Sequence, residues 1–114
     1  MSGAQEVTAE SFEGEVLQSP IPVLVDLYAD WCMPCRAMGK VLDQLAPRLE
    51  GRVKVAKVNV DQEPDLAGAF GVSSIPMLVL FKDGQMADQA VGALSGAAIL
   101  QMVQKVTSVQ PASR

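Results

Sequence analysis

Hydrophobic positions along the chain form two kinds of segment. Nearly continuous apolar runs rich in β-branched residues are typical of strands covered on both faces, and the clearest run spans residues 22–29. Three more runs, the last of them short, lie at residues 53–60, 77–81 and 89–91. Between the runs, apolar residues recur three and four positions apart, which is the spacing of an amphipathic helix. The sequence therefore predicts strands that alternate with helices.

The longest predicted helix begins at Pro34 and is closed by Gly51. Proline suits the first turn of a helix, because its missing N–H would have no intrahelical partner there. The apolar face of this helix is formed by Met38, Val41, Leu42, Leu45 and Leu49.

Shorter helices are predicted at residues 11–17, at residues 64–70 and after Ser95, which is a typical N-cap residue. Asp83-Gly84 predicts a tight hairpin turn between the last two strands. This order of elements favours an α/β fold in which helices cover both faces of one sheet. The inward face of the last helix is expected to contain Ile99, Met102, Val103 and Val106.

Length and composition fit one globular domain over residues 1–114, with an ordered core at about residues 5–107 and a frayed tail at residues 108–114. Hydrophobic residues make up 49% of the chain and charged residues 19%, which is far from the composition of disordered proteins. The net charge of −4 leaves no basic surface for phosphates, so nucleic acids and anionic membranes are not expected partners.

The longest uninterrupted apolar run, residues 77–81, is far shorter than the roughly 20 residues of a membrane span. The first ten residues carry no basic residue and no apolar segment, unlike a secretory signal. We therefore expect a cytoplasmic protein, and a mature secreted form whose signal has been removed is the alternative. The chain has no histidine, which excludes Ser-His-Asp triads, Cys-His nucleophiles and imidazole metal sites.

Cys32 and Cys35 are the only cysteines, and two residues separate them. A closed zinc site needs four ligands such as thiolates, so a monomer with two cysteines and no histidine cannot complete one. The pair sits between a strand and a helix, where the positive end of the helix dipole favours the thiolate of Cys32 and lowers its pKa. Cys35 lies one turn further in and is expected to be shielded. An exposed nucleophile beside a shielded resolving thiol is the arrangement that thiol–disulfide exchange requires.

These residues resemble the thioredoxin family. The resemblance covers roughly residues 5–107, and its motifs appear in the family's order. It implies a five-stranded mixed sheet flanked by four helices, and a monomer with a redox-active Cys32–Cys35 pair and no other cofactor. The implied partners are proteins with disulfides and a flavoprotein reductase that returns the electrons. The matching motifs are Trp31-Cys32-Met33-Pro34-Cys35, Asp26, Lys57, Ile75-Pro76, Lys82-Asp83-Gly84 and Val91-Gly92.

Asp26 interrupts an apolar strand, so burial is expected to raise its pKa. Alternatively, it is a structural acid on a less buried strand. The resemblance implies that Asp26 exchanges a proton with Cys35 through water. Lys57 has the strand parity of Val53 and Val55, so it should point to a covered side near Asp26; a snorkelling surface lysine is the alternative.

The resemblance also implies a cis peptide bond before Pro76, opposite the cysteines. The backbone of Ile75 would then be free to pair with an extended substrate. Gly92 would allow close approach beside it, although an ordinary turn at the end of a strand would also explain this glycine. Trp31 is expected to be a partly exposed shield over the site.

Three residues depart from the family pattern. Met33 stands where the family usually has glycine, and Met77 where threonine commonly follows the cis-proline. Methionine adapts to varied apolar partners, so our hypothesis is that both methionines flank the dithiol in a more apolar docking rim, with neutral variation as the alternative. Lys40 replaces a proline that usually kinks the helix, which predicts a straighter helix.

Three functions from different classes remain at this stage. The first is a protein-disulfide reductase with a low reduction potential, because Met33-Pro34 offers no cationic or hydrogen-bonding side chain that would stabilise the Cys32 thiolate further. A more oxidising disulfide donor or isomerase is a variant of it. The second is a binding or chaperone module in which the cysteines matter little. The third is a metal or iron–sulfur site shared between two chains.

Overall fold

The computed structural model describes residues 4–107, which form one five-stranded mixed sheet. Its strands are β1 (Ala4–Glu6), β2 (Val23–Tyr28), β3 (Lys54–Asn59), β4 (Met77–Lys82) and β5 (Gln85–Val91). They lie in the order β1-β3-β2-β4-β5. The pairs of β3 with β1 and β2 are parallel, while β4 runs antiparallel to β2 and to β5.

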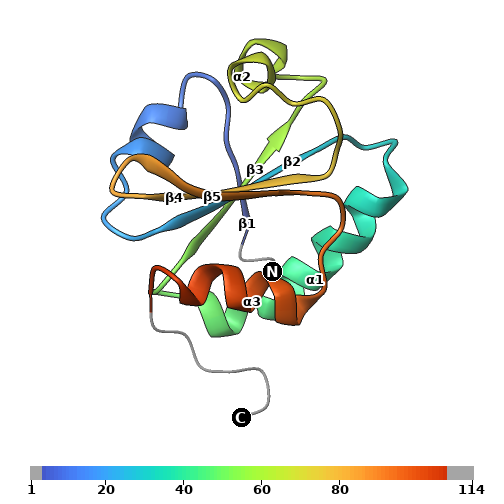
Figure 1. Ribbon diagram of the computed structural model, residues 1–114. Coiled ribbons are helices and arrows are strands. Elements are labelled where there is room, and N and C mark those ends of the chain that lie inside the picture. The colour runs from blue at the N-terminus through green and yellow to red at the C-terminus, as the bar shows by residue number, and fades with distance from the viewer. Residues whose placement is uncertain (1–3, 108–114) are drawn as a thin grey trace.

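Four helical elements cover the sheet in the described part of the chain (Figure 1). α1 (Met33–Leu49) and α3 (Gly96–Gln104) lie on one face. α2 (Pro64–Ala69) and a short π-helical segment, η1 (Glu13–Leu17), lie on the other. The predicted α/β fold with helices on both faces is therefore confirmed.

Strand alternation divides the interior into two cores. Leu24, Val55 and Leu78 face α1 and α3, whereas their neighbours along the same strands face η1 and α2. The second core holds the three phenylalanines of the chain, which meet edge to face with ring centroids 5.6 to 5.9 Å apart and join η1 and α2 to the sheet. They are Phe12, Phe70 and Phe81.

Most predicted elements are present, with boundaries that differ by one or two residues. α1 passes through Lys40 without interruption, and the hydroxyl oxygen of Ser95 accepts a hydrogen bond from the Ala98 N–H at 3.1 Å, as expected of an N-cap. β5 begins at Gln85, four residues earlier than predicted. β1 was not predicted from the residues, and Val106 packs against the core from beyond the end of α3. The predicted frayed tail lies outside the described residues.

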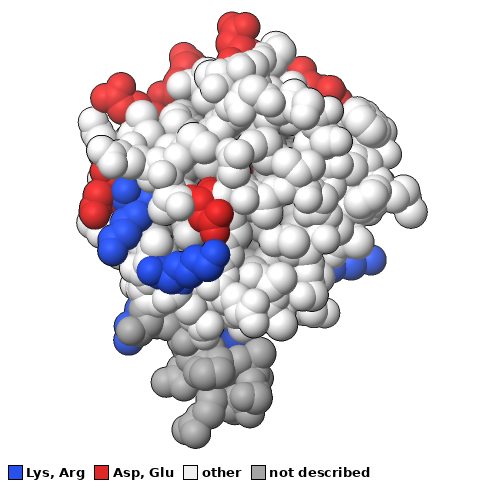
Figure 2. All heavy atoms as spheres, viewed as in Figure 1, with Lys and Arg blue, Asp and Glu red and all other residues white. Residues whose placement is uncertain are grey.

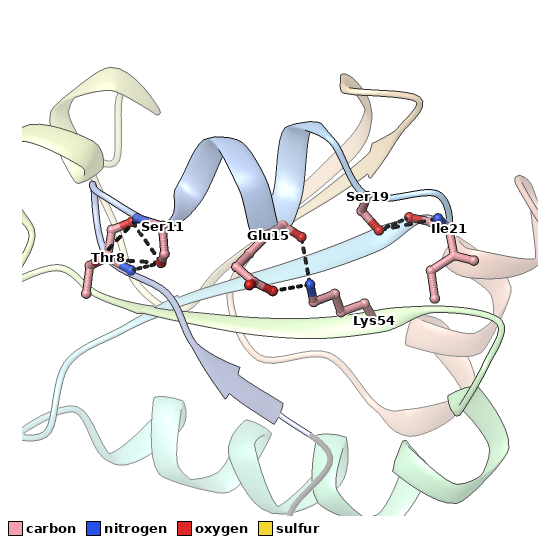
Figure 3. A network of polar contacts seen from close by, with 6 residues as sticks. All are labelled: Thr8, Ser11, Glu15, Ser19, Ile21 and Lys54. Carbon is pink, nitrogen blue, oxygen red and sulfur yellow. Dashed lines mark hydrogen bonds and ion pairs between the residues drawn. The ribbon is translucent and has the colours of Figure 1, made fainter.

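Polar contacts fix the segment between β1 and β2 against β3 (Figure 3). The Lys54 ammonium donates to the backbone carbonyl of Glu15 at 2.9 Å and also forms an ion pair with the Glu15 carboxylate. At the entrance to this segment, the Thr8 N–H donates to the Ser11 hydroxyl at 2.9 Å. These contacts compensate for the short length of η1, which has only one fully buried side chain, Val16.

The predicted hairpin turn is also present, and it makes one glycine costly to replace. Asp83 and Gly84 have φ angles of 54° and 77°, as a two-residue type I′ turn requires. A β-carbon on Gly84 would lie 2.8 Å from the carbonyl oxygen of Leu17. This distance is shorter than a van der Waals contact, so the backbone at Leu17 or Gly84 would have to shift.

Gly84→Ala is therefore expected to lower the free energy of unfolding by about 2–4 kcal/mol, from backbone strain plus overpacking. Gly71→Ala is the matched control, because Gly71 has a φ of 66° but open space where its β-carbon would lie. It should cost only about 1–2 kcal/mol, the strain alone. Urea unfolding of both variants measures the difference, and equal losses would contradict the proposed clash.

Candidate redox site

The two cysteines lie where β2 ends and α1 begins, and they form a disulfide with their Cα atoms 5.2 Å apart. Cys32 is the N-cap of α1, and its Sγ accepts a hydrogen bond from the backbone N–H of Cys35 at 3.2 Å. Pro34 occupies the first turn, as predicted. N–H groups in the first turn of a helix have no partner within the helix, and here the Cys32 sulfur accepts a hydrogen bond from one of them at the positive end of the helix dipole. The same N–H would stabilise a thiolate on Cys32.

The expected difference in exposure between the cysteines is wrong for this disulfide state. Cys32 is 5% exposed and Cys35 3%, so both are buried. Both pack in one small cluster with Ala29, against which Ile75 also lies. Their position in α1 therefore distinguishes the two sulfurs, since Cys32 caps the helix while Cys35 lies inside its first turn.

The loop before β4 lies against this cluster. The peptide bond between Ile75 and Pro76 is cis, as the resemblance implied. The Gly92 N–H donates to the Pro76 carbonyl at 2.8 Å, and Gly92 has a φ of 98°, so this glycine joins the end of β5 to the cis-proline. No hydrogen bond among residues 4–107 uses the backbone of Ile75, which leaves its polar groups available to a partner strand.

Asp26 is fully buried in the middle of β2, with an exposed fraction of 0%, so the alternative of a less buried strand is ruled out. Neither carboxyl oxygen has a hydrogen-bond partner in the described part of the chain. Burial disfavours the ionised carboxylate and raises the pKa of Asp26 to about 7. The positive charge of Lys57 opposes this rise, and the negative charge of Glu6 adds to it. Asp26 can therefore gain or lose a proton near neutral pH.

Lys57 lies between two acids, and this position was only partly predicted. In the parallel strands β1, β3 and β2, Glu6 pairs with Lys57 and Lys57 pairs with Asp26. The three side chains therefore form a row on the face covered by α1, which confirms that Lys57 points to the covered side near Asp26. The row passes from exposed Glu6 through half-buried Lys57 to fully buried Asp26.

Tyr28 connects the outer half of this row. Its hydroxyl donates to the Glu6 carboxylate at 2.6 Å, and the Lys57 ammonium lies 4.4 Å from the centre of its ring. Burial raises the pKa of Tyr28, and the hydrogen bond to Glu6 adds to the rise, so the phenol stays protonated at neutral pH. The ammonium also lies 3.7 Å from the position of a β-carbon on Gly39, directly beneath α1.

An open groove of about 790 Å³ leads from solvent to this region. Its lining includes buried Cys35 and half-buried Tyr28 and Lys57, together with the exposed side chains Arg36, Lys40 and Asp43 of α1. The groove therefore borders both Cys35 and Lys57, the lysine that pairs with buried Asp26 across the sheet.

Glu6→Gln is expected to lower the pKa of Asp26, because it removes the negative charge that adds to the effect of burial. The shift should be smaller than the one caused by burial, which is the largest contribution. It can be measured by NMR titration of the Asp26 carboxyl carbon. Glu50→Gln is the control, since Glu50 follows the far end of α1 and should leave the titration unchanged. An unchanged pKa in Glu6→Gln would contradict the coupling.

The rim of the site includes exposed apolar side chains. Charged side chains gather over α2 and at the left of the molecule in Figure 2, whereas the right of this view, towards the turn from β2 into α1, is almost uncharged. Trp31 is 70% exposed, more than expected of a shield, and its indole N–H donates to Asp61 at 2.8 Å. Met33 is 69% exposed and Val91 57%.

The hypothesis that two methionines flank the dithiol is wrong for Met77. This residue is only 5% exposed and belongs to the core under η1 and α2. The reason is strand alternation, because Met77 has the same parity on β4 as Val79 and Phe81. Met33 alone of the two extends the exposed apolar surface.

Three contacts at the site could not be found from the sequence. Glu6 reaches the site only through the three-residue strand β1, and Tyr28 has no signal of its own within the apolar run of residues 22–29. Asp61 accepts the hydrogen bond from Trp31 and lies just after β3. Its own backbone N–H donates to the side-chain oxygen of buried Asn59 at 2.9 Å. An Asn-x-Asp sequence after a strand was the one available sign of this turn.

Residues 4–107 contain no cluster of three or more potential metal-ligating side chains. The same residues include no helix with the length and apolarity needed to cross a membrane.

Comparison with known proteins identifies close relatives. A thioredoxin family model matches residues 3–105. Thioredoxin 1 of Nostoc sp. is 47% identical over 105 residues, covering 92% of this chain and 98% of that protein. Thioredoxin 1 of Synechococcus elongatus is 51% identical over 94 residues, covering 82% and 88%. The thioredoxin of Rickettsia felis is 40% identical over 102 residues, covering 90% and 97%.

Proposed function

The chain belongs to the thioredoxin family and is a protein-disulfide reductase, and from this premise we propose how its residues share the reaction. The Cys32 thiolate attacks one sulfur of a substrate disulfide, forming a mixed disulfide and releasing the first substrate thiolate. Cys35 then attacks the Cys32 sulfur, which forms the Cys32–Cys35 disulfide and releases the second thiolate. Two electrons pass from the dithiol to the substrate, and both leaving thiolates take up protons.

The observation that carries this assignment is the place of the cysteines in α1. Cys32 is the N-cap and its sulfur accepts an N–H bond, so its thiolate is the better stabilised of the two. Cys35 lies in the first turn and borders the groove that also reaches Lys57. This arrangement supports Cys32 as the nucleophile and Cys35 as the resolving thiol.

Asp26 is the base that accepts the proton of Cys35, through water in the groove. Its burial and a pKa of about 7 support this role, because a base titrating near neutral pH can both take and return a proton. Lys57, next to Asp26 across the sheet, stabilises the carboxylate that exists once Asp26 has lost its proton. Lys57 is thus a supporting residue for this proton transfer.

Substrates bind as an extended segment across the apolar surface beside Cys32. The unpaired backbone of Ile75 supports this mode, since it lies next to the cis-proline and packs against the cysteines. Gly92 keeps the neighbouring strand end free of a side chain. Trp31 and Met33 supply exposed apolar contacts at the rim.

The electrons come from a flavoprotein thioredoxin reductase, and the substrates are proteins with accessible disulfides. The chain acts in the cytoplasm as a monomer and as a single thioredoxin domain over residues 1–114, with no cofactor beyond its own cysteines. The single sheet with a core on each face and the match over residues 3–105 support the one-domain assignment.

The reduction potential of the Cys32–Cys35 couple tests the proposed direction of electron flow. Trp31 is the only tryptophan, so its fluorescence reports the state of the pair in thiol buffers of known potential. We expect a value near −270 mV, about the potential typical of thioredoxins. A value near −120 mV, about that of strong oxidants, would indicate a disulfide donor or isomerase. Absence of a reversible couple would favour a binding module.

A further inference from the structure

Met33 presents a thioether sulfur at the mouth of the redox site. It is the first residue of α1, lies between the two cysteines, and is 69% exposed. Exposure separates the described methionines into two groups, because Met86 on β5 is 52% exposed and the others are at most 5% exposed. The buried group consists of Met38, Met77 and Met102.

In the disulfide state, this thioether is the oxidisable sulfur that the site exposes. Cys32 and Cys35 are bonded to each other and buried, so neither offers a thiolate to an oxidant. A hydroperoxide can transfer one oxygen atom to the Met33 sulfur, which is oxidised by two electrons to the sulfoxide. The peroxide O–O bond breaks and the peroxide is reduced to water or an alcohol.

Arg36 provides a partner for the oxygen that this reaction adds. Its guanidinium Nη1 lies 3.9 Å from the Met33 sulfur, from one turn further along α1. A sulfoxide oxygen is a much stronger hydrogen-bond acceptor than a thioether, so the cation would hold it at the rim. The Met86 sulfur accepts no hydrogen bond among residues 4–107. Met33 therefore combines exposure with a donor already in place.

We propose that Met33 is a site of sulfoxidation by peroxides, and that its sulfoxide weakens the docking of protein disulfides beside Cys32. The docking part rests on the proposed function. A substrate segment that covers Met33 gains from contact with an apolar side chain. After oxidation it must desolvate a polar S=O group held by Arg36, which opposes binding. Small dithiols do not cover this surface, so their exchange with the cysteine pair is unaffected.

The experiment treats the disulfide form with hydrogen peroxide and locates the added oxygen by peptide mass spectrometry. We expect oxidation of Met33 and Met86 and protection of the three buried methionines. After peroxide removal, kcat/KM for a protein disulfide should fall about tenfold, mainly through KM, because substrate binding must then desolvate one polar group. The rate at which dithiothreitol reduces the Cys32–Cys35 bond should not change.

Two methionine variants, each compared with its own untreated form, assign the effect. Met33→Leu should lose no activity on peroxide treatment, because leucine cannot be oxidised in this way. Met86→Leu should lose as much as the unsubstituted chain. Met33→Gln, which places a polar amide at the rim, should show the raised KM without peroxide. Equal peroxide losses in Met33→Leu and the unsubstituted chain would overturn the proposal, as would protection of Met33.

The dithiothreitol rate separates this inference from the proposed function. If oxidation of Met33 slowed both reactions equally, the sulfoxide would act on the cysteines and the docking mechanism would be wrong. If the untreated protein reduced no protein disulfide while dithiothreitol exchange was normal, the proposed function would fail, and the modification of Met33 would still stand on the mass spectra.

Discussion

Cys32→Ser is expected to reduce the rate of protein-disulfide reduction by at least about a thousandfold, as removal of a nucleophile does in other enzymes. A serine hydroxyl has almost no anionic form at neutral pH, so the N–H of Cys35 that contacts the Cys32 sulfur would have no thiolate to stabilise. The measurement is the steady-state reduction of a protein disulfide with a reductant that maintains the dithiol.

Cys35→Ser is the matched control, because it removes the other sulfur of the same pair. This variant should also fail to turn over, but it should accumulate a mixed disulfide between Cys32 and the substrate, since the resolving thiol is missing. Non-reducing electrophoresis would reveal that species. If Cys32→Ser trapped the substrate and Cys35→Ser did not, the two roles would be reversed.

The elements that could be predicted from the sequence are those whose signals are local. The helical spacing from Met38 to Leu49 predicted α1 from a single segment of the chain. Asp83-Gly84 predicted the hairpin because few other pairs accept two positive φ angles. The Cys-x-x-Cys spacing at a strand-to-helix junction similarly indicated the redox pair.

What could not be predicted depends on contacts between distant segments. β1 is three residues long and has no period of its own, and its strand conformation comes from pairing with β3. Glu6 reaches the row with Lys57 only through this pairing. Met77 directly follows Pro76 in the sequence, but strand parity turns its side chain into the core and away from the cysteines. The cluster that buries Cys32 likewise brings distant segments together, because Val60 after β3 and Ile75 before β4 both pack against it.

The burial of Asp26 makes the stability of the protein depend on pH. Its pKa is about 7 in the folded protein and about 3.9 in an unfolded chain, so between these values the folded state binds more protons. The free energy of unfolding must therefore decrease as pH rises from about 4 to about 7 and then level off. A difference of about 3 pKa units corresponds to about 4 kcal/mol.

Asp26→Asn removes this dependence while retaining the size of the side chain. The variant and the unsubstituted chain should have similar stability near pH 4, where the carboxyl is largely protonated in both states. Above pH 7 the variant should be more stable by up to about 4 kcal/mol. Urea unfolding of the disulfide form at pH values from 4 to 8 measures the difference between the two curves. This difference cancels the contributions of Glu15 and Asp88, whose pKa values are lowered in the folded protein and whose stabilising effects are lost as the pH falls below about 5.

Asp43→Asn provides the control, because Asp43 is an exposed acid on α1 beside the same groove. Its stability difference from the unsubstituted chain should not grow between pH 4 and 8, because Asp43 is exposed and lacks the burial that acts on Asp26. If the Asp26→Asn curve ran parallel to that of the unsubstituted chain, Asp26 would not hold its proton to neutral pH. It could then not serve as the base for Cys35, and the proton would have to leave through the groove to solvent.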